Sequence, residues 1–438
     1  MNRERYSLFF KYVIPSLLSF ALSGVYAIVD GLFVGNSIGD TGLSAINIAY
    51  PMVSLLQALG TGLGMGGAVL YSVCDGEGHK DRAENFARAS IGLLLRVSAV
   101  TTALLYVFAK PLLIFLGARG ELVPMGLEYL RIIILGGTLQ IFATGVVPIT
   151  RNLGGASFSM ITMVGGFALN IALDWFFVWV LEMGMFGAGL ATIIGQGLTA
   201  LLGLAYILVK APSLLRLSVS ASISGAGRIC RVGLAPFGLT LCPIVSMAMM
   251  NKAAIINGGE NALACYACVA YSLTIVYTLL QGVGDGCQPL MSRCYGEGDE
   301  EGLRFYTGLA HICAAGISLI CMAVLWLLRD RLGYIFGTSA HVNLMVGACM
   351  PIFIAGLVFL GYTRVVTSAL YATEKSLQSY ILVYSEPLFR LVLLLSLPIL
   401  LGTDGVWWSE SLGIILCAAL GFALSRSNIS NKKVKKPQ

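Results

Sequence analysis

The segment GLGMGGAVLYSVCDGEG at Gly62–Gly78 returns later in the chain as GVGDGCQPLMSRCYGEG at Gly282–Gly298. The two copies share nine identical residues in seventeen, at a fixed offset of 220, whereas chance would give about one, so the chain contains an internal duplication. Both copies lie in apolar segments that are too long for a soluble core. Paired halves in such a chain are typical of secondary transporters, and the sequence therefore predicts a carrier.

The composition places the chain in a lipid bilayer. Of the 438 residues, 57% are apolar and only 11% are charged, which is too few to keep the surface of a soluble globule hydrated. A helix needs about 20 mostly apolar residues to cross about 30 Å of hydrocarbon. The sequence contains twelve such segments, and the predicted fold is an all-α integral membrane protein with twelve transmembrane helices. The expected spans are 12–34, 44–74, 88–116, 124–150, 157–181, 186–211, 229–256, 262–292, 302–328, 341–371, 377–401 and 405–426.

The two halves are expected to be parallel. Six crossings separate the two GEG sequences, so both copies face the same side, and a pseudo-two-fold axis along the membrane normal relates the halves. Pro15 in the first span has a counterpart in Pro236 at an offset of 221, so the first apolar segment belongs to the repeat and is not a signal peptide. We expect an N-terminal lobe at 1–217, a cytoplasmic linker at 218–227, a C-terminal lobe at 228–426 and a basic cytoplasmic tail at 427–438.

The basic residues predict the orientation of the chain. If the N-terminus is inside, 19 of the 28 Lys and Arg residues lie in inner segments, as is typical of cytoplasmic loops. Both termini are therefore expected in the cytoplasm. The net charge of +6 and the lysine-rich tail fit a topology determinant or a contact with anionic lipid better than a nucleic-acid site.

The glycine and cysteine residues are interpreted structurally. The GxGxG runs at Gly62 and Gly282 favour close helix packing, with a bend that lets each half rock as an additional interpretation. Eleven cysteines, an odd number, lie mostly inside predicted helices and imply no disulfide framework. Cys265 and Cys268 form a CxxC motif, but a zinc site needs four ligands and the three histidines are scattered, so packing is expected.

Four polar side chains are predicted to share one depth in the membrane. An ionisable residue inside a span is costly, which makes each one a candidate functional residue. Asp30 lies in the first span, Asn170 and Asp174 in the fifth, and Thr192 in the sixth. Counting about 1.5 Å per residue from the outer helix ends places all four in one slab. Two carboxylates, an amide oxygen and a hydroxyl there would suit Na⁺ as hard oxygen ligands or would accept protons.

The C-terminal half carries different chemistry at the corresponding place. At an offset of 216, Asn170 and Asp174 map to Glu386 and Arg390, which also lie four residues apart on one helix face. A structural ion pair and a substrate contact are both open for this polar pair. Asp285 is either a second acid site or a residue that reaches the inner interface, and the sequence assigns no role to Arg364.

The order and spacing of these residues resemble the multidrug and toxic compound extrusion (MATE) family, closest to its bacterial MepA-type branch. The resemblance rests on VDGLFVGNSIG around Asp30, AINIAYP at Ala45–Pro51, the paired GEG loops, and Asn170 and Asp174 followed by GAGLAT at Gly187–Thr192. It implies an antiporter in the bacterial cytoplasmic membrane that expels cationic, amphipathic compounds in exchange for Na⁺ or H⁺. It also implies that Asp30, Asn170, Asp174 and Thr192 form the cation site of the N-terminal lobe.

The expected mechanism is alternating access, in which cation occupancy of the N-terminal lobe shifts the balance between inward and outward states. The expected partners are small amphipathic cations and the bilayer, with the chain acting as a monomer. No nucleic acid, no cofactor and no metal beyond a coupling Na⁺ are expected. The main alternative is a flippase or exporter of a lipid-linked or other amphipathic metabolite, although such a carrier should prefer basic cavity residues.

Other classes fit the sequence less well. A major-facilitator carrier also has two six-helix halves, but GEGHKDRAEN lacks the basic continuation of that family's inner loop. An enzyme would need a clustered nucleophile and base or a metal site, and no HExxH or GxSxG motif occurs. A channel would need a repeated pore-lining filter, which two unequal halves do not suggest.

Overall fold

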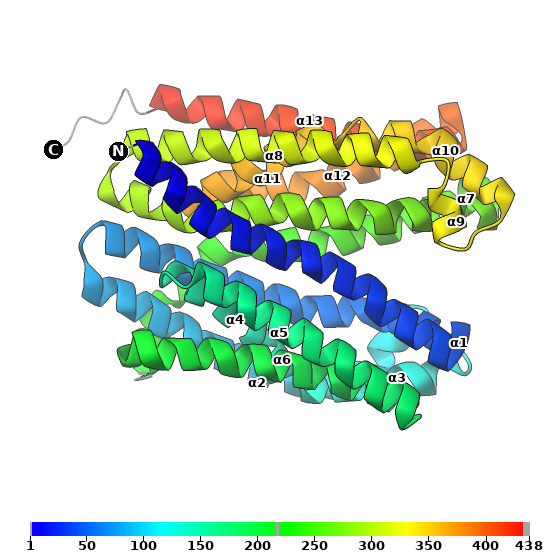
Figure 1. Ribbon diagram of the computed structural model, residues 1–438, viewed down its shortest axis with the longest axis horizontal. Helices are drawn as coiled ribbons and strands as arrows, with labels where there is room; N and C mark the ends of the chain where they lie inside the picture. The colour runs from blue at the N-terminus through cyan, green and yellow to red at the C-terminus, as the bar shows by residue number, and fades with distance from the viewer. Residues whose placement is uncertain (1, 216–218, 432–438) are drawn as a thin grey trace. The chain divides into compact units, whose positions relative to one another are not determined.

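The computed structural model describes residues 2–215 and 219–431, and the described residues form helices without any strand (Figure 1). Only the backbone is described at 2, 27–28, 30–32, 34–40, 43, 215, 219–224 and 427–431. The helices are α1 (Asn2–Gly76), α2 (Lys80–Phe115), α3 (Leu122–Leu135), α4 (Gly137–Asn152), α5 (Ala156–Asp174), η1 (Trp175–Val180), α6 (Gly184–Lys210), η2 (Pro212–Leu215), α7 (Val219–Glu297), α8 (Glu300–Leu328), α9 (Leu332–Ile335), α10 (Ala340–Ile354), α11 (Leu357–Ala372), α12 (Ser376–Leu401) and α13 (Thr403–Asn431).

The helices account for the predicted membrane spans. Within the described residues, nine helical segments are long and apolar enough to cross a membrane, and two bent helix pairs raise the number to eleven. One of the nine, Gly225–Glu297, consists of two helices joined by a kink at Gly259, where φ is +67°. Counting its two arms separately gives the twelve spans expected from the sequence. The helix that contains the first expected span begins at Asn2, before residue 12.

Two of the predicted spans are broken helices. α3 and α4 meet beside Gly136 at an angle of 56°, and α10 and α11 meet beside Gly356 at 46°. The two glycines lie 220 residues apart, so each half breaks the same span at the same position. The sequence predicted each span as one continuous helix, because an isolated glycine is tolerated inside a helical pattern and does not by itself indicate a break.

Residue contacts divide the chain into two compact units. Unit 1 contains Met1–Leu241 and Pro289–Glu300, and unit 2 contains Cys242–Gln288 and Glu301–Gln438. The stretch expected as a linker, 218–227, is helical from Val219 onward. Residue 218 and tail residues 432–438 lie outside the described residues.

The repeated glycine runs pack helices closely in both units. In unit 1, a Cβ atom at Gly64 on α1 would overlap the backbone of Gly145 on α4. In unit 2, a Cβ atom at Gly284 on α7 would overlap the Ser368 side chain and lie 3.3 Å from the Arg364 carbonyl oxygen on α11. Both runs stay helical. The structure therefore supports the packing interpretation of these glycines.

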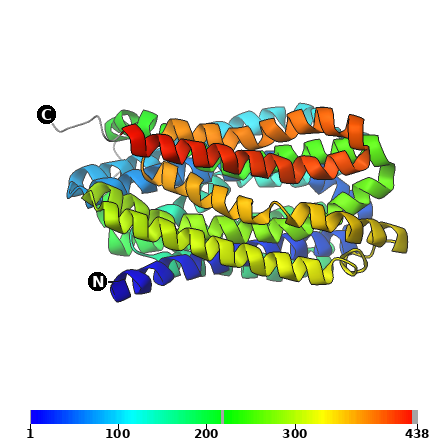
Figure 2. The same ribbon diagram turned by 90° about the horizontal axis from the view of Figure 1, so that it is seen from above.

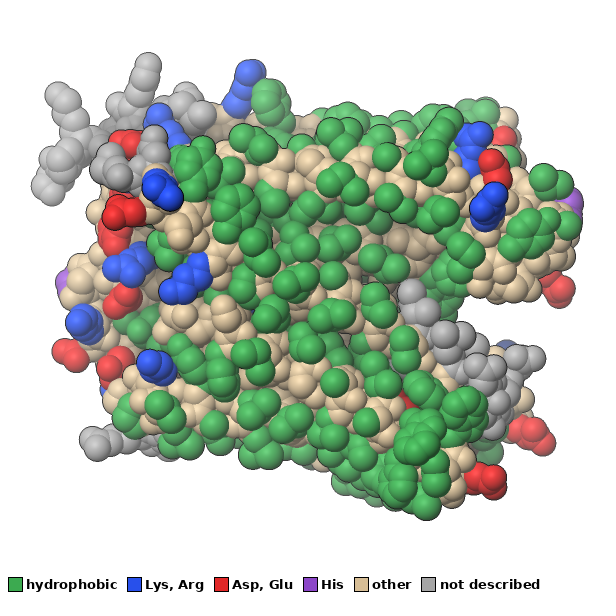
Figure 3. Space-filling view, in the orientation of Figure 1, with side chains coloured by type: hydrophobic (Ala, Val, Ile, Leu, Met, Phe, Trp, Pro, Cys, Tyr) green, Lys and Arg blue, Asp and Glu red, His purple; other side chains and the backbone are tan. Residues whose placement is uncertain are grey.

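The outward-facing side chains are suited to lipid. α12 and α13 lie side by side in unit 2 (Figures 1 and 2), and Ile399 on α12 and Leu327 on α8 are about four-fifths exposed, at 81% and 79%. On the face shown in Figure 3, charged side chains gather toward the two ends, while apolar side chains cover most of the surface between them. Such a band suits the hydrocarbon core of a bilayer. Polar side chains are unfavourable there, because hydrocarbon forms no hydrogen bonds with them.

Candidate functional site

The last turn of α5 places two polar side chains inside unit 1. Asn170 is 3% exposed and Asp174 is fully buried, and their spacing of four residues puts both on one helix face. The amide oxygen and the amide nitrogen of Asn170 are buried and form no hydrogen bond with any residue in the described part of the chain. Buried amides are nearly always bonded, so the Asn170 side chain is suited to a ligand.

α6 brings a hydroxyl to the same level. A Cβ atom at Gly195 would lie 2.9 Å from the Cβ atom of Asn170 and 2.8 Å from the Gly166 carbonyl oxygen, so α5 and α6 touch here. Thr192 lies three residues before Gly195 on the same helix face, which places it near the level of Asp174. Its hydroxyl donates a hydrogen bond to the Ala188 carbonyl oxygen at 3.0 Å. The oxygen lone pairs of Thr192 can therefore still coordinate a cation.

The N-terminal arm of α1 runs beside this cluster. The Tyr26 ring stacks on Phe167 with centroids 4.8 Å apart, and Phe33 meets Trp179 edge to face at 5.7 Å. The backbone of residue 30 lies between these two contacts along α1, just as Asn170 and Asp174 lie between them along α5 and η1. The side chain of Asp30 lies outside the described residues.

A π-helix follows directly on Asp174 and was not predicted from the sequence. The segment η1 covers Trp175–Val180, and the Leu181 N–H bonds to the Phe176 carbonyl oxygen at 2.9 Å, five residues back. Wider π-turns occur mostly at functional positions in helices. The bulky run WFFVWV is compatible with an ordinary helix and provides no signal for this change.

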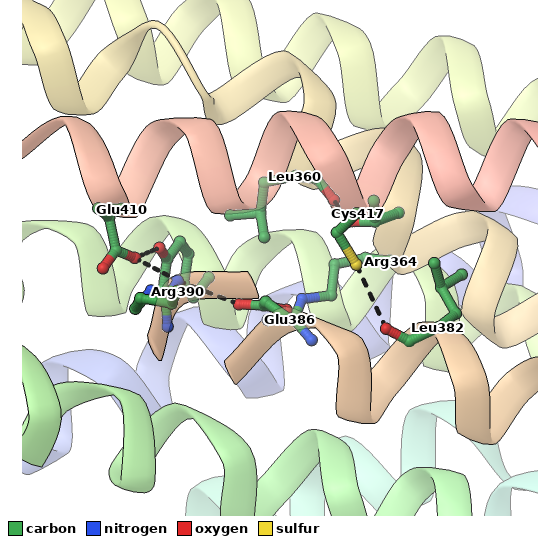
Figure 4. A network of polar contacts seen from close by, with 9 residues as sticks. Leu360, Arg364, Leu382, Glu386, Arg390, Glu410 and Cys417 are labelled. Carbon is green, nitrogen blue, oxygen red and sulfur yellow. Dashed lines mark hydrogen bonds and ion pairs between the residues drawn. The ribbon is translucent and has the colours of Figure 1, made fainter. Parts of the chain in front are cut away.

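Unit 2 contains a buried network of charged side chains from three helices (Figure 4). The Arg390 Nη2 atom on α12 lies 2.7 Å from Glu410 Oε1 on α13 and 3.3 Å from Glu386 Oε1 on α12. The Tyr277 hydroxyl on α7 donates to the same Glu410 oxygen at 2.6 Å. The pair expected from the i, i+4 spacing is therefore part of a larger cluster.

Arg364 on α11 completes this network. Its Nη2 atom lies 3.7 Å from Glu386 Oε2, and its guanidinium carbon lies 5.9 Å from the centre of the Tyr277 ring. Two arginines and two glutamates balance in formal charge. Sequence reasoning left Arg364 without a role and missed Glu410, although an acid inside the span 405–426 is a signal of the kind that identified Asp174.

Asp285 lies in a separate polar cluster of unit 2. Its carboxylate is 4% exposed and accepts hydrogen bonds from Gln281 Nε2 and from the Tyr371 hydroxyl, both at 2.7 Å. The Ser368 hydroxyl lies 3.2 Å from the same tyrosine oxygen. Asp285 thus links α7, on which it lies, to α11 through Tyr371.

The cysteines show no metal-binding arrangement. Among the described residues, no group of three or more His, Cys, Asp or Glu side chains is placed to hold a metal ion. Cys265 and Cys268 are buried and unlinked, and the Cys265 sulfur lies 3.5 Å from the Cys349 sulfur. Packing accounts for the CxxC motif.

Comparison with known proteins gives consistent matches over most of the chain. The family model MatE matches residues 15–176 and 236–395. The multidrug export protein MepA of Staphylococcus saprophyticus is 24% identical over 414 residues, which cover 93% of this chain and 90% of the relative. MepA of Staphylococcus aureus strain MRSA252 is 23% identical over 415 residues with the same coverage.

Two solved structures share the fold. A MOP superfamily transporter from Pyrococcus furiosus is 25% identical with a TM-score of 0.91, over 98% of this chain and 97% of that chain. A multidrug resistance MATE family transporter of the MOP superfamily, in an outward-facing conformation, is 26% identical with a TM-score of 0.90, over 98% and 96%. Together with the twelve spans, these matches confirm the predicted fold class of two six-helix lobes.

Proposed function

The chain belongs to the MatE family, and from this premise we propose that it exports cationic, amphipathic compounds in exchange for Na⁺ or H⁺. Family membership confirms the resemblance drawn from the sequence and makes the chain a multi-pass membrane transporter. The relatives named above are multidrug export proteins. For this chain, the class of substrate and the coupling to an ion are our proposals.

The coupling proposal rests on the Asn170 amide, which bonds to no residue in the described part of the chain, beside the buried Asp174 carboxylate. A buried carboxylate is costly unless a cation or a proton neutralises it. The Asn170 oxygen and the Thr192 hydroxyl supply further oxygen ligands for Na⁺ at the same level. We assign Asn170, Asp174 and Thr192, together with Asp30, to this coupling site.

Transport would proceed by alternating access between lobes 1–217 and 228–426. An ion drives this change only if it binds one state more tightly than the other. The carboxylate at the end of α5 provides such a difference, since any change in its packing alters its affinity for Na⁺ or a proton. In this proposal both termini are cytoplasmic and the protein lies in the plasma membrane.

Efflux of a fluorescent lipophilic cation from proteoliposomes tests the proposal, with a Na⁺ or a pH gradient imposed separately. We expect one gradient to drive efflux in the wild type, and Asp174→Asn to reduce driven efflux about tenfold or more, within the usual range of ion coupling. The substitution keeps the size of the side chain but removes its charge.

Asp404→Asn is the matched control, because Asp404 is exposed in the first turn of α13. This variant should transport at the wild-type rate. Normal gradient-driven efflux by Asp174→Asn would overturn the coupling assignment. If the wild type exports none of several lipophilic cations, a lipid-linked or other amphipathic metabolite becomes the substrate class to test.

A further inference from the structure

Arg364 is a buried cation with few partners. The residue is 5% exposed, yet its guanidinium donates no hydrogen bond to any residue in the described part of the chain, and its Nε atom is fully buried without a partner. Among the described residues, its only carboxylate contact is with Glu386 Oε2 at 3.7 Å, beyond hydrogen-bond length. A guanidinium carries five N–H donors, so this one retains a large unused capacity to bind an acceptor.

Glu386 is the loosely held acid of the same network. Its side chain is 12% exposed, against 5% for Glu410 and 2% for Arg390, and its contacts with the two arginines are long, at 3.3 and 3.7 Å. Glu410 satisfies Arg390 at 2.7 Å and also accepts from Tyr277 at 2.6 Å. Arg390 and Glu410 thus form a tight pair, while Arg364 and Glu386 form a loosely held pair of opposite charges.

The Tyr277 ring helps to position Arg364. Its hydroxyl is bonded to Glu410, which fixes the ring, and the Arg364 guanidinium carbon lies 5.9 Å from the ring centre. A cation over an aromatic face is attracted by the ring. The aromatic ring of Tyr277 therefore orients Arg364 without using the N–H donors of the guanidinium.

We propose that Arg364 and Glu386 form a substrate subsite for zwitterionic amphiphiles, in which Arg364 binds a carboxylate and Glu386 binds a protonated amine. A guanidinium fork matches the two oxygens of a carboxylate. The network already balances its charge, so a zwitterion adds no net charge to the buried cluster, whereas a simple cation would. This inference rests on the proposed export function and extends it to a second substrate class.

The test compares two rhodamine dyes that differ at one group. The ethyl ester is a cation, and the parent carboxylic acid is a zwitterion. Binding of each dye to the purified full-length protein is followed by fluorescence anisotropy, and efflux from proteoliposomes is measured in parallel. The variants are Arg364→Met and Arg364→Lys, with Arg96→Met as the matched control, because Arg96 is exposed on α2.

We expect Arg364→Met to weaken binding of the acid about tenfold to a hundredfold, as for the loss of a charged hydrogen bond, and to change binding of the ester less than about threefold. Arg364→Lys keeps the charge but loses the fork and should weaken the acid alone by a smaller factor. Arg96→Met should leave both dyes unaffected. If Arg364→Met does not fold, the selective loss in Arg364→Lys decides the question.

The alternatives give distinct results. Equal weakening of both dyes by the Arg364 variants would mean that Arg364 only supports the structure, and this would overturn the subsite. A wild type that binds and exports the ester but not the acid would also overturn it, while leaving the proposed export function intact. A wild type that handles neither dye would contradict the export function itself.

Discussion

At the scale of single residues, the charged network of unit 2 predicts unequal costs for its two acids. Glu410→Gln removes the partner that holds Arg390 at 2.7 Å and accepts from Tyr277. Breaking a buried pair costs about 3–5 kcal/mol, because the remaining charge loses its compensation. Glu386→Gln removes only contacts of 3.3 and 3.7 Å. We expect the melting temperature of the purified protein to fall clearly more for Glu410→Gln.

The wild-type protein and the Glu386→Gln variant serve as the references for that measurement. A fall in melting temperature that is equal in the two variants, or larger for Glu386→Gln, would contradict the division into a tight pair and a loosely held pair.

Residues on one helix could be paired from the sequence, and residues on different helices could not. Glu386 and Arg390 share α12, so their spacing of four predicts a contact, which the structure contains. Glu410 is 20 residues from Arg390, and Tyr277 is 133 residues from Glu410. Contacts at such separations depend on tertiary packing. The role of Arg364 depends on the same packing.

At the scale of helices, the close approach of α1 and α4 predicts a steric effect of one methyl group. A Cβ atom at Gly64 would overlap the backbone of Gly145, and backbone cannot move aside as a flexible side chain can. Gly64→Ala should therefore lower the melting temperature and the yield of folded protein. Gly308→Ala on α8 is the control, since a Cβ atom there meets nothing within 4 Å.

The control should equal or exceed the wild type in stability, because alanine is favoured over glycine in a helix by about 0.5–1 kcal/mol. Thermal unfolding of the two variants in the same detergent checks the difference. Indistinguishable curves for Gly64→Ala and Gly308→Ala would show that α1 and α4 tolerate separation.

The membrane spans could be predicted from the sequence, because the hydropathy of a span is summed over about 20 residues. The helix breaks and the π-helix within the spans could not be predicted. The breaks beside Gly136 and Gly356 and the π-helix η1 are local departures from a regular helix. A Cβ atom at Gly136 would overlap the Ile193 side chain on α6, for example, so a neighbouring helix shapes this break. Such a contact leaves no trace in the hydropathy of the segment itself.

At the scale of the whole molecule, the halves share a scaffold and differ in chemistry. The family model matches twice, from 15 and from 236, at the offset of 221 that separates Pro15 and Pro236. Yet the positions of Asn170 and Asp174 in one half are held by Glu386 and Arg390 in the other. Duplication preserved the helices, while the polar residues diverged. The sequence predicted this asymmetry, because both features are readable at fixed offsets.

The proposed coupling site at Asp174 predicts that ion and substrate affinities depend on each other. If the ion at Asp174 and the substrate each favour one state, then substrate binding must depend on the ion, and the two effects must be equal by linkage. We expect the dissociation constant of the cationic rhodamine ester to change about fivefold or more when the coupling ion, Na⁺ or H⁺, is varied.

In Asp174→Asn the dye should still bind, but its dissociation constant should no longer respond to the ion. Asp404→Asn should respond as the wild type does. Anisotropy titrations of the three proteins measure this directly, and an ion response that persists in Asp174→Asn would place the coupling group elsewhere in the chain.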